Sequence, residues 1–350
     1  MILRIAVALA TVALILTGCT AEDAPDAAAS APTAATTVAG TQPTAAAATA
    51  TATSATVAGP MLDSIESTLI PPGYDPTGEP LPPMLLLHGG GDSRDFLVRW
   101  QERLEQLWAS DALPPMVVAT LSAGRSIYMD YVDGSQCRQS FISGPFIDHL
   151  TARFNVSEDG IALFGLSMGG AGALRLAFNE PERFCVVVAM EPALDTLTDF
   201  SELRSRDRWW RGDALVESVY GGPGDEDYWS RTHPTSLVLV NDAAIRDFGM
   251  AIFIEVGDED FFNLHEGTEI LHRVLWDHDI LHQYYLIWGA NHGGNTLEPR
   301  YDVALAFLDG ALRPDTSPDA GVVRLEGSLG AAKRQAEATS PDRWVGEFAP

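Results

Sequence analysis

The sequence predicts an α/β fold in which a mainly parallel central sheet carries helices on both faces. Short apolar runs alternate with longer helix-forming segments from about residue 60 onwards. Continuous apolar strands separated by helices are typical of parallel sheets that are buried on both faces. A second observation is a serine flanked by glycines at one strand–helix junction, and a third is that polar, glycine-rich loops follow other apolar runs.

The apolar runs and the segments between them give the expected elements in order. The predicted strands are residues 84–87, 116–121, 161–164, 184–190, 251–256 and 283–288. The predicted helices are residues 95–109, 141–154, 168–178, 262–277 and 300–312. In an open parallel sheet the working residues lie just past the carboxyl ends of the strands, so the loops that follow the strands are where chemistry is expected.

Ser167 lies in the pentapeptide Gly165-Leu166-Ser167-Met168-Gly169, between a predicted strand and a predicted helix. In this context a sharp turn exposes the serine Oγ at the carboxyl edge of the sheet, and the flanking glycines avoid clashes with the strand and the helix. The helix that begins there directs the positive end of its dipole toward developing negative charge. The pattern predicts that Ser167 is a nucleophile.

A run of glycines, His88-Gly89-Gly90-Gly91, follows the predicted strand 84–87. Glycines let the backbone approach a ligand and aim amide groups at an oxyanion. We expect the amides of Gly90 and Met168 to form a two-donor oxyanion hole. His88 is interpreted as structural, because it comes before the serine turn and lies at the end of the strand.

Two aspartates, Asp258 and Asp260, follow the predicted strand 251–256. A Ser-His-Asp triad needs one carboxylate to orient the imidazole and stabilise its charged form. Asp260 is preferred because it adjoins an aromatic pair and the next helix. Capping of that helix is the expected role of the other aspartate.

His292 lies in the glycine-rich loop 288–294, after the last predicted strand. A histidine in such a loop reaches a serine easily, so His292 is predicted to be the general base. Ser167, Asp260 and His292 then occur in the chain order of α/β-hydrolases, each past a strand. The fold class is therefore refined to an α/β-hydrolase fold.

With these motifs the chain resembles the esterase D, or "putative esterase", branch of the α/β-hydrolases over about residues 61–312. The resemblance implies that Ser167, Asp260 and His292 form the triad and that Gly90 and Met168 supply the oxyanion amides. That branch includes S-formylglutathione hydrolases, feruloyl and acetylxylan esterases, siderophore trilactone esterases and mycolyltransferases. The motifs that carry it are Ile70-Pro71-Pro72-Gly73-Tyr74-Asp75, Leu85-Leu86-Leu87-His88-Gly89-Gly90-Gly91, Tyr131-Val132-Asp133-Gly134-Ser135, Gly165-Leu166-Ser167-Met168-Gly169-Gly170 with Ala173-Leu174-Arg175-Leu176-Ala177, and Gly257 with Asp260.

The sequence departs from this branch in a few places. The region before Ile70 is short, so one or two N-terminal strands are expected to be missing. The segment 191–235 has no usable match and is expected to cap the site. Its aromatic side chains fit either an apolar acyl pocket or ordinary core packing, and the sequence leaves both open; they are Trp209, Trp210, Tyr220, Tyr228 and Trp229.

The two ends of the chain are expected to lie outside the catalytic domain, residues 60–312. Residues 1–19 read as a lipoprotein signal peptide, with an apolar stretch that ends at Leu16-Thr17-Gly18-Cys19. Cys19 is the expected lipidation site and membrane anchor, which places the protein outside the cell at the envelope. Residues 20–59 are rich in Ala, Thr and Pro and are predicted to be a disordered linker. Residues 313–350 form a polar tail, with a short helix expected around 325–337.

The net charge and the spacing of the histidines argue against nucleic acid and metal ions as partners. The formal net charge of −26 argues against binding to nucleic acid. The histidines lack metal-ligand spacing except for His278 and His282, which fit a helix end equally well, so neither a metal nor a cofactor is expected. Pairing of Cys137 with Cys185 stays open, because exported proteins form disulfides but buried free cysteines are common.

These observations together predict a serine carboxylic-ester hydrolase at the cell envelope, acting on a small-molecule or carbohydrate-linked ester through an acyl-enzyme. One alternative is acyl transfer to an envelope carbohydrate, for which the same triad would serve. Another is a non-catalytic lipoprotein that keeps the hydrolase fold as a binding module. The sequence does not distinguish which ester is used.

Overall fold

The computed structural model describes residues 66–339 apart from 159, 197–201, 203, 211, 222–225, 315–316 and 318. These residues belong to one compact unit. The predicted signal peptide, Cys19, the predicted linker and the last residues of the tail lie outside the described residues. Among the residues described, no helix has both the length and the apolar character needed to cross a membrane.

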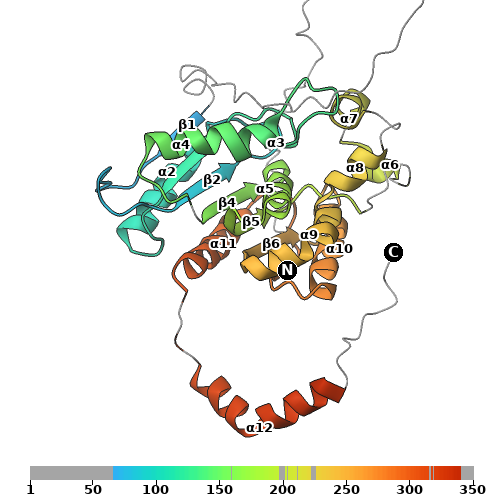
Figure 1. The fold of residues 1–350 in the computed structure, drawn as a ribbon. Coiled ribbons are helices and arrows are strands. Elements are labelled where there is room, and N and C mark those ends of the chain that lie inside the picture. The colour runs from blue at the N-terminus through green and yellow to red at the C-terminus, as the bar shows by residue number, and fades with distance from the viewer. Residues whose placement is uncertain are drawn as a thin grey trace, which may run out of the picture. The chain divides into compact units, whose positions relative to one another are not determined.

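A seven-stranded sheet forms the centre of the fold, in the order β1-β3-β2-β4-β5-β6-β7 (Figure 1). All neighbouring strands are parallel except β1, which pairs antiparallel with β3. The central strands are almost entirely buried, as their apolar sequences predict. The strands are β1 Glu66–Leu69, β2 Pro83–Leu87, β3 Val117–Leu121, β4 Ile161–Leu166, β5 Phe184–Met190, β6 Ala251–Gly257 and β7 Gln283–Ile287.

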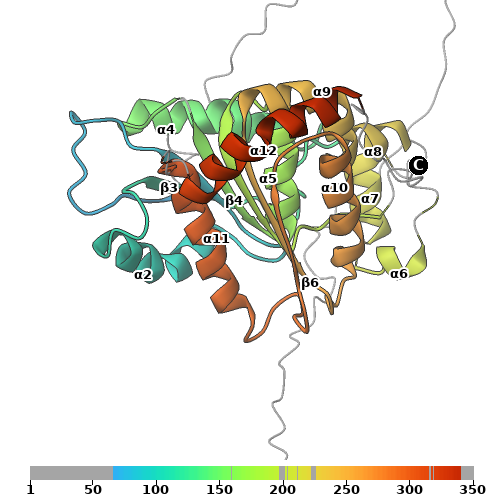
Figure 2. The same ribbon diagram turned by 90° about the horizontal axis from the view of Figure 1, so that it is seen from below.

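Two helices cover one face of the sheet: α2 (Phe96–Ala109) and α11 (Leu297–Leu312). Alternate strand residues such as Leu86 and Phe164 point to this side, because successive side chains of a strand face opposite ways. Trp100 of α2 packs edge-on against Phe164 of β4 and against Tyr301 of α11. Figure 2 shows α2 and α11 together on this side of the strands.

The other face is covered by more helices, and its core is larger. Leu85, Leu163 and Val187 point into it from the strands, interleaved with the residues of the first face. The longer helices on this side are α4 (Ile147–Arg153), α5 (Met168–Asn179), α9 (Pro234–Phe248) and α10 (Leu264–Asp277) (Figure 2). The prediction of helices on both faces is confirmed.

Some elements differ from their predicted bounds. The segment expected as one helix over 141–154 is α3 (Arg138–Phe141), a π-helical turn (Ile142–Phe146) and then α4. Pro145 lies in the π turn and has no N–H to donate, which explains why the regular helical ladder is interrupted there. The short helix expected around 325–337 is also longer than predicted, since α12 spans Ala320–Thr339.

Strand β1 is present just before Ile70, and it supplies the antiparallel edge of the sheet. Cys137 and Cys185 are both free, so the two thiols are not paired. Burial raises the pKa of the Cys185 thiol to about 11, which keeps it protonated and unreactive at neutral pH.

Candidate active site

Ser167 occupies a strained turn between β4 and α5. Its φ of 57° and ψ of −115° are outside the ordinary regions for a residue with a side chain. A Cβ at Gly165 would lie 2.1 Å from the carbonyl oxygen of Gly169, and one at Gly169 would lie 2.1 Å from that of Leu87. Only glycine fits either position, so the two flanking glycines are required by close packing of strand and helix.

The structure brings the three predicted triad residues together. The Nε2 atom of His292 lies 2.9 Å from Ser167 Oγ. The Nδ1 atom of the same ring lies 2.7 Å from Asp260 Oδ2. Both distances are those of hydrogen bonds, so the imidazole links the hydroxyl to the carboxylate.

Asp260, and not Asp258, is the aspartate that faces His292. Its side chain is buried, and its Oδ1 accepts hydrogen bonds from the N–H groups of Phe262 and Leu264 at 2.7 and 3.2 Å. Burial works to raise the pKa of Asp260, but the hydrogen bond with His292 and other contacts outweigh it and lower the pKa. Asp258 accepts instead from the backbone N–H of Gly289, at 2.6 Å, and supports the loop after β7.

The loops after β6 and β7 are hydrogen-bonded directly to each other. Asn291 Oδ1 accepts from the N–H of Phe261 at 2.9 Å, and Ala290 O accepts from the N–H of Glu259 at 3.0 Å. The loop that carries the imidazole is thus fixed against the loop that carries its carboxylate.

Beneath Asp260 lies a buried group of charged residues that sequence reasoning missed: Glu191, Glu255 and Arg300. The Nε and Nη2 atoms of Arg300 each bond one carboxylate oxygen of Glu255 at 2.6 Å, and Nη2 also pairs with Glu191. Glu255 did carry a signal, because a charged residue within a buried strand needs an opposite charge nearby. Its partner at position 300 was not identifiable from the sequence alone.

The glycine-rich loop after β2 borders the same cleft as His292. His88 is fully buried, its Nε2 accepts from the N–H of Ala123 at 3.0 Å, and its Nδ1 lies 2.8 Å from Gly89 O. Burial lowers the pKa of His88, consistent with a neutral ring that braces the loop. Gly90 lines the same cleft as Ser167, and Met168 is the first residue of α5, where a backbone N–H has no intrahelical acceptor.

A cleft of about 380 Å³ opens above Ser167. One wall is aromatic: the rings of Trp209 and Phe262 stack with centroids 5.5 Å apart and planes 3° apart, and Trp210 meets Phe262 edge-on. Leu215, Ile127 and Leu264 extend the apolar surface, and Arg125 brings a charge into it. Trp209 is 53% exposed, so part of its ring faces the open cleft and is not packed in a core.

The two interpretations of the aromatic residues in segment 191–235 each hold for part of it. Trp209 and Trp210 line the cleft, whereas Tyr220 and Trp229 are buried with Val216, Val219, Ile127 and Met129 in a small core of their own. Val216, Val219 and Tyr220 lie on α7 (Asp213–Tyr220) and Trp229 on α8 (Glu226–Thr232), while Ile127 and Met129 come from the loop after β3. The segment expected to cap the site therefore contributes both cleft wall and support.

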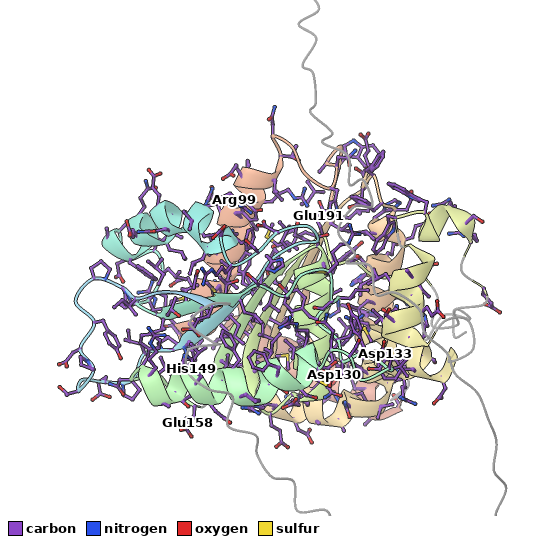
Figure 3. The ribbon with its side chains drawn as sticks, turned by 90° about the horizontal axis from the view of Figure 1, so that it is seen from above. Arg99, Asp130, Asp133, His149, Glu158 and Glu191 are labelled. Atoms are coloured by element: carbon purple, nitrogen blue, oxygen red, sulfur yellow. The ribbon has the colours of Figure 1, made fainter. Side chains whose placement is uncertain are left out.

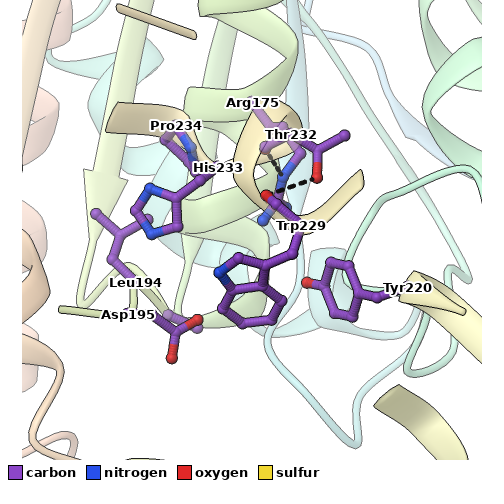
Figure 4. A pocket seen from close by; sticks show the side chains of 9 residues that line it. Arg175, Leu194, Asp195, Tyr220, Trp229, Thr232, His233 and Pro234 are labelled. Carbon is purple, nitrogen blue, oxygen red and sulfur yellow. Dashed lines mark hydrogen bonds between the residues drawn. The ribbon is translucent and has the colours of Figure 1, made fainter. Parts of the chain in front are cut away.

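Arg175 connects α5 to the residues around this small core. It is buried, and it donates from Nε to Thr232 O at 2.9 Å and from Nη1 to Ile127 O at 3.0 Å. Figure 4 shows Arg175 reaching Thr232 beside Trp229 and His233. The space between these side chains is only about 10 Å³, about that of one water, so it is not a ligand site.

This geometry agrees with the comparisons to known proteins. Residues 64–284 match the family model described as "Putative esterase". The chain belongs to this esterase family. It is thus a carboxylesterase-type hydrolase with an α/β-hydrolase fold. No curated protein matches the chain.

Solved structures similar to this esterase share its fold at low sequence identity. A ferulic acid esterase is 19% identical, with a TM-score of 0.56 over 70% of this chain and 91% of that one. A fluorophosphonate-binding serine hydrolase of Staphylococcus aureus is 18% identical, with a TM-score of 0.54 over 69% and 91%. An S-formylglutathione hydrolase from Agrobacterium tumefaciens is 20% identical, with a TM-score of 0.53 over 71% and 87%.

The histidines outside the site of this esterase make contacts that the sequence did not reveal. His149 pairs with the buried Glu66, and His272 Nδ1 lies 2.8 Å from His282 Nε2. His278 pairs with Asp242. In the part of the chain that the structure describes, the one cluster with cation-ligand geometry is Glu191, Asp260 and His292, and these groups already bond one another and Arg300.

Proposed function

We propose that this esterase is a serine carboxylic-ester hydrolase that works through Ser167, His292 and Asp260 and an acyl-enzyme intermediate. The observation that carries the proposal is the bridging position of His292, with one ring nitrogen 2.9 Å from Ser167 Oγ and the other 2.7 Å from Asp260 Oδ2. This is the arrangement in which an imidazole accepts a serine proton while a carboxylate stabilises the resulting cation.

The proposed reaction follows from these positions. Ser167 Oγ attacks the ester carbonyl as His292 Nε2 takes its proton, and the backbone amides of Gly90 and Met168 hold the oxyanion. The ester bond breaks when the imidazolium returns the proton to the leaving alkoxide. Water then attacks the acyl-enzyme with His292 again as the base, releasing the acid and free Ser167.

The cleft supports an ester with a large apolar or aromatic group. The stacked rings of Trp209 and Phe262 offer a flat apolar surface next to the reacting atoms. Arg125 is exposed in the same cleft, and no described side chain forms an ion pair with it. An anionic group on the substrate, such as a carboxylate, would pair with this guanidinium.

The N-terminal sequence supports a location at the bacterial cell envelope. The apolar stretch that ends in Leu16-Thr17-Gly18-Cys19 favours export and lipid attachment at Cys19. A disordered linker over 20–59, rich in Ala, Thr and Pro, would then hold the catalytic domain away from the membrane. Carbohydrate-linked esters of the envelope would lie within reach of an enzyme tethered in this way.

The test is hydrolysis of p-nitrophenyl esters from acetyl to palmitoyl by the detergent-solubilised full chain. Ser167→Ala should reduce kcat by several orders of magnitude without changing the melting temperature. Ser110→Ala, at the exposed end of α2, is the matched control and should retain full activity. A fluorophosphonate should label the native protein and not the Ser167→Ala variant.

Three results would redirect the proposal. Turnover that survives the loss of Ser167 would exclude it as the nucleophile. A labelled serine with little hydrolysis in water, but acylated product when sugar alcohols are added, would assign the site to acyl transfer to an envelope carbohydrate. A folded protein that neither reacts with the probe nor turns over ester would favour a binding lipoprotein.

A further inference from the structure

Glu191 is a buried carboxyl beside the triad that the proposed mechanism does not use. It is the first residue after β5, its side chain is fully buried, and Figure 3 labels it beside the ends of the central strands. We infer that Glu191 is a positioning residue that keeps a proton and donates it in a hydrogen bond to Asp260, fixing the carboxylate that orients His292. The inference rests on the proposed function of the triad.

The backbone holds Glu191 in an unusual conformation at this place. Its φ of 45° is in the left-handed region, which glutamate rarely adopts. Its N–H donates to Glu255 O at 2.8 Å, while nearby residues bond the serine turn: Ser167 N to Met190 O at 2.8 Å and Ala193 N to Ser167 O at 3.0 Å. Backbone strain of this kind is stored at functional sites, and here it aims a carboxyl group at the triad from below.

The side chain of Glu191 lies between Arg300 and the triad. Its Oε1 pairs with Arg300 Nη2, and its Oε2 accepts weakly from the N–H of Gly257 at 3.4 Å. The same Oε2 lies 3.8 Å from His292 Nδ1, and carboxylate oxygens of Glu191 and Asp260 lie within 4.8 Å of each other. Two carboxyl groups this close repel each other when both are ionised, and a proton shared between them removes that repulsion.

The charges in this buried group show which carboxyl keeps the proton. Glu191, Glu255 and Asp260 face one guanidinium, Arg300, and one imidazole, His292. Glu255 receives two hydrogen bonds from Arg300, so it is the carboxylate that this cation neutralises. Asp260 must be ionised to stabilise a charged His292. A third buried carboxylate would be uncompensated, which is strongly unfavourable.

The electrostatic surroundings of the carboxyl groups agree with this assignment. Burial, followed by the hydrogen bond to Asp260, raises the pKa of Glu191 to about 9, although Arg300 acts in the opposite direction. Burial also raises the pKa of Glu255, against the two hydrogen bonds from Arg300. At neutral pH Glu191 therefore carries a proton and acts as a donor.

A protonated Glu191 completes the set of hydrogen bonds around Asp260. One carboxylate oxygen accepts from the backbone of Phe262 and Leu264, and the other faces His292 Nδ1. With the added donor, the plane of the carboxylate is fixed and the imidazole is held with Nε2 toward Ser167. Such supporting contacts decide whether a catalytic group stays in its productive position.

The experiment compares Glu191→Gln with Glu191→Ala in the full chain, measuring kcat and KM for p-nitrophenyl acetate from about pH 6 to about pH 10. Because displacement of a catalytic group by about 1 Å costs up to about 100-fold, Glu191→Ala should lower kcat by about 10- to 100-fold with little change in KM. Glu191→Gln keeps an N–H donor, so it should recover most of that loss. The native enzyme should lose kcat above about pH 9, as Glu191 ionises beside Asp260, and the glutamine variant should not.

A second measurement does not depend on activity. Infrared spectra recorded during a pH titration should show a buried protonated carboxyl group in the native chain that is absent in Glu191→Gln. If the two variants are equally impaired, or the alkaline limbs of native and Gln enzymes coincide, or the carboxyl band is missing, Glu191 does not hold the proton. A native chain that shows the band but no hydrolysis would instead count against the proposed function.

Discussion

The ring of Phe262 meets the imidazole of His292 edge-on, with centroids 4.7 Å apart and an angle of 74° between the planes. The same phenyl ring also stacks on Trp209. The candidate general base and the apolar wall of the cleft therefore share one side chain. What binds along the wall lies directly next to the proton-transfer group.

Removal of the Trp209 side chain should weaken substrate binding more than it slows the chemical step. Trp209→Ala is expected to raise KM for octanoyl and aromatic p-nitrophenyl esters by about tenfold, about 1.4 kcal/mol of lost apolar contact, and to leave acetyl ester turnover nearly unchanged. Trp276 is matched in exposure, 54% against 53%, but lies on α10 away from the cleft, so Trp276→Ala is the control. Equal effects on short and long esters would show that Trp209 does not contact the acyl group.

The two aspartates after β6 should differ sharply on amide substitution. Asp260→Asn is expected to lower kcat by about 10⁴-fold, because an amide cannot stabilise the charged imidazole. Asp258→Asn keeps an oxygen that accepts from Gly289 and should change kcat by less than about threefold, within about 0.6 kcal/mol. Steady-state kinetics at neutral pH measure both, and the reverse order of effects would move the triad carboxylate to Asp258.

The glycines around Ser167 should tolerate no side chain. Gly169→Ala would place a methyl group 2.1 Å from the carbonyl oxygen of Leu87, so we expect loss of more than about 4 kcal/mol of folding free energy, measured by urea unfolding. At Gly90, in contrast, a Cβ would point into open space, with no atom within 4 Å. Gly90→Ala should accordingly unfold at nearly the native urea concentration; similar destabilisation of both variants would contradict the packing argument.

Arg125 should select for charge on the substrate. Arg125→Gln is expected to lower kcat/KM for an ester that carries a carboxylate by about tenfold, about 1.4 kcal/mol, while leaving a neutral ester of the same size unaffected. Raising the salt concentration should weaken the native preference, because the guanidinium is exposed and its attraction is screened. If the preference is unchanged in the variant, anionic selectivity does not come from this residue.

The predicted anchor is tested by the location of the protein. Cys19→Ala should prevent lipid attachment, so the enzyme should fail to incorporate labelled palmitate and should leave the detergent phase in a phase-separation experiment. The Cys137→Ala variant retains Cys19 and should partition as the native chain does. Detergent partitioning of the Cys19 variant would point to a different membrane attachment.

Much of the site was predictable because its residues follow strands. Ser167, Asp260 and His292 each lie just past a strand end, and parallel strands bring such ends to one edge of the sheet. Glu191 and Arg300 were not predictable, since their contact joins residues far apart in sequence and nothing local marks the pair. Trp209 and Trp229 show the same limit: both are tryptophans of one segment, and only the tertiary structure separates a cleft residue from a core residue.

The hydrogen bonds between the loops after β6 and β7 constrain how this enzyme can diversify. Asn291 and Ala290 on one loop accept from Phe261 and Glu259 on the other, so neither loop has an independent shape. An insertion in one would pull the imidazole away from its carboxylate unless the other changed length with it. The segment that bears Trp209 and Trp210 meets the loop after β6 through aromatic side chains, so substitutions in it are the more accessible route to new substrate specificity.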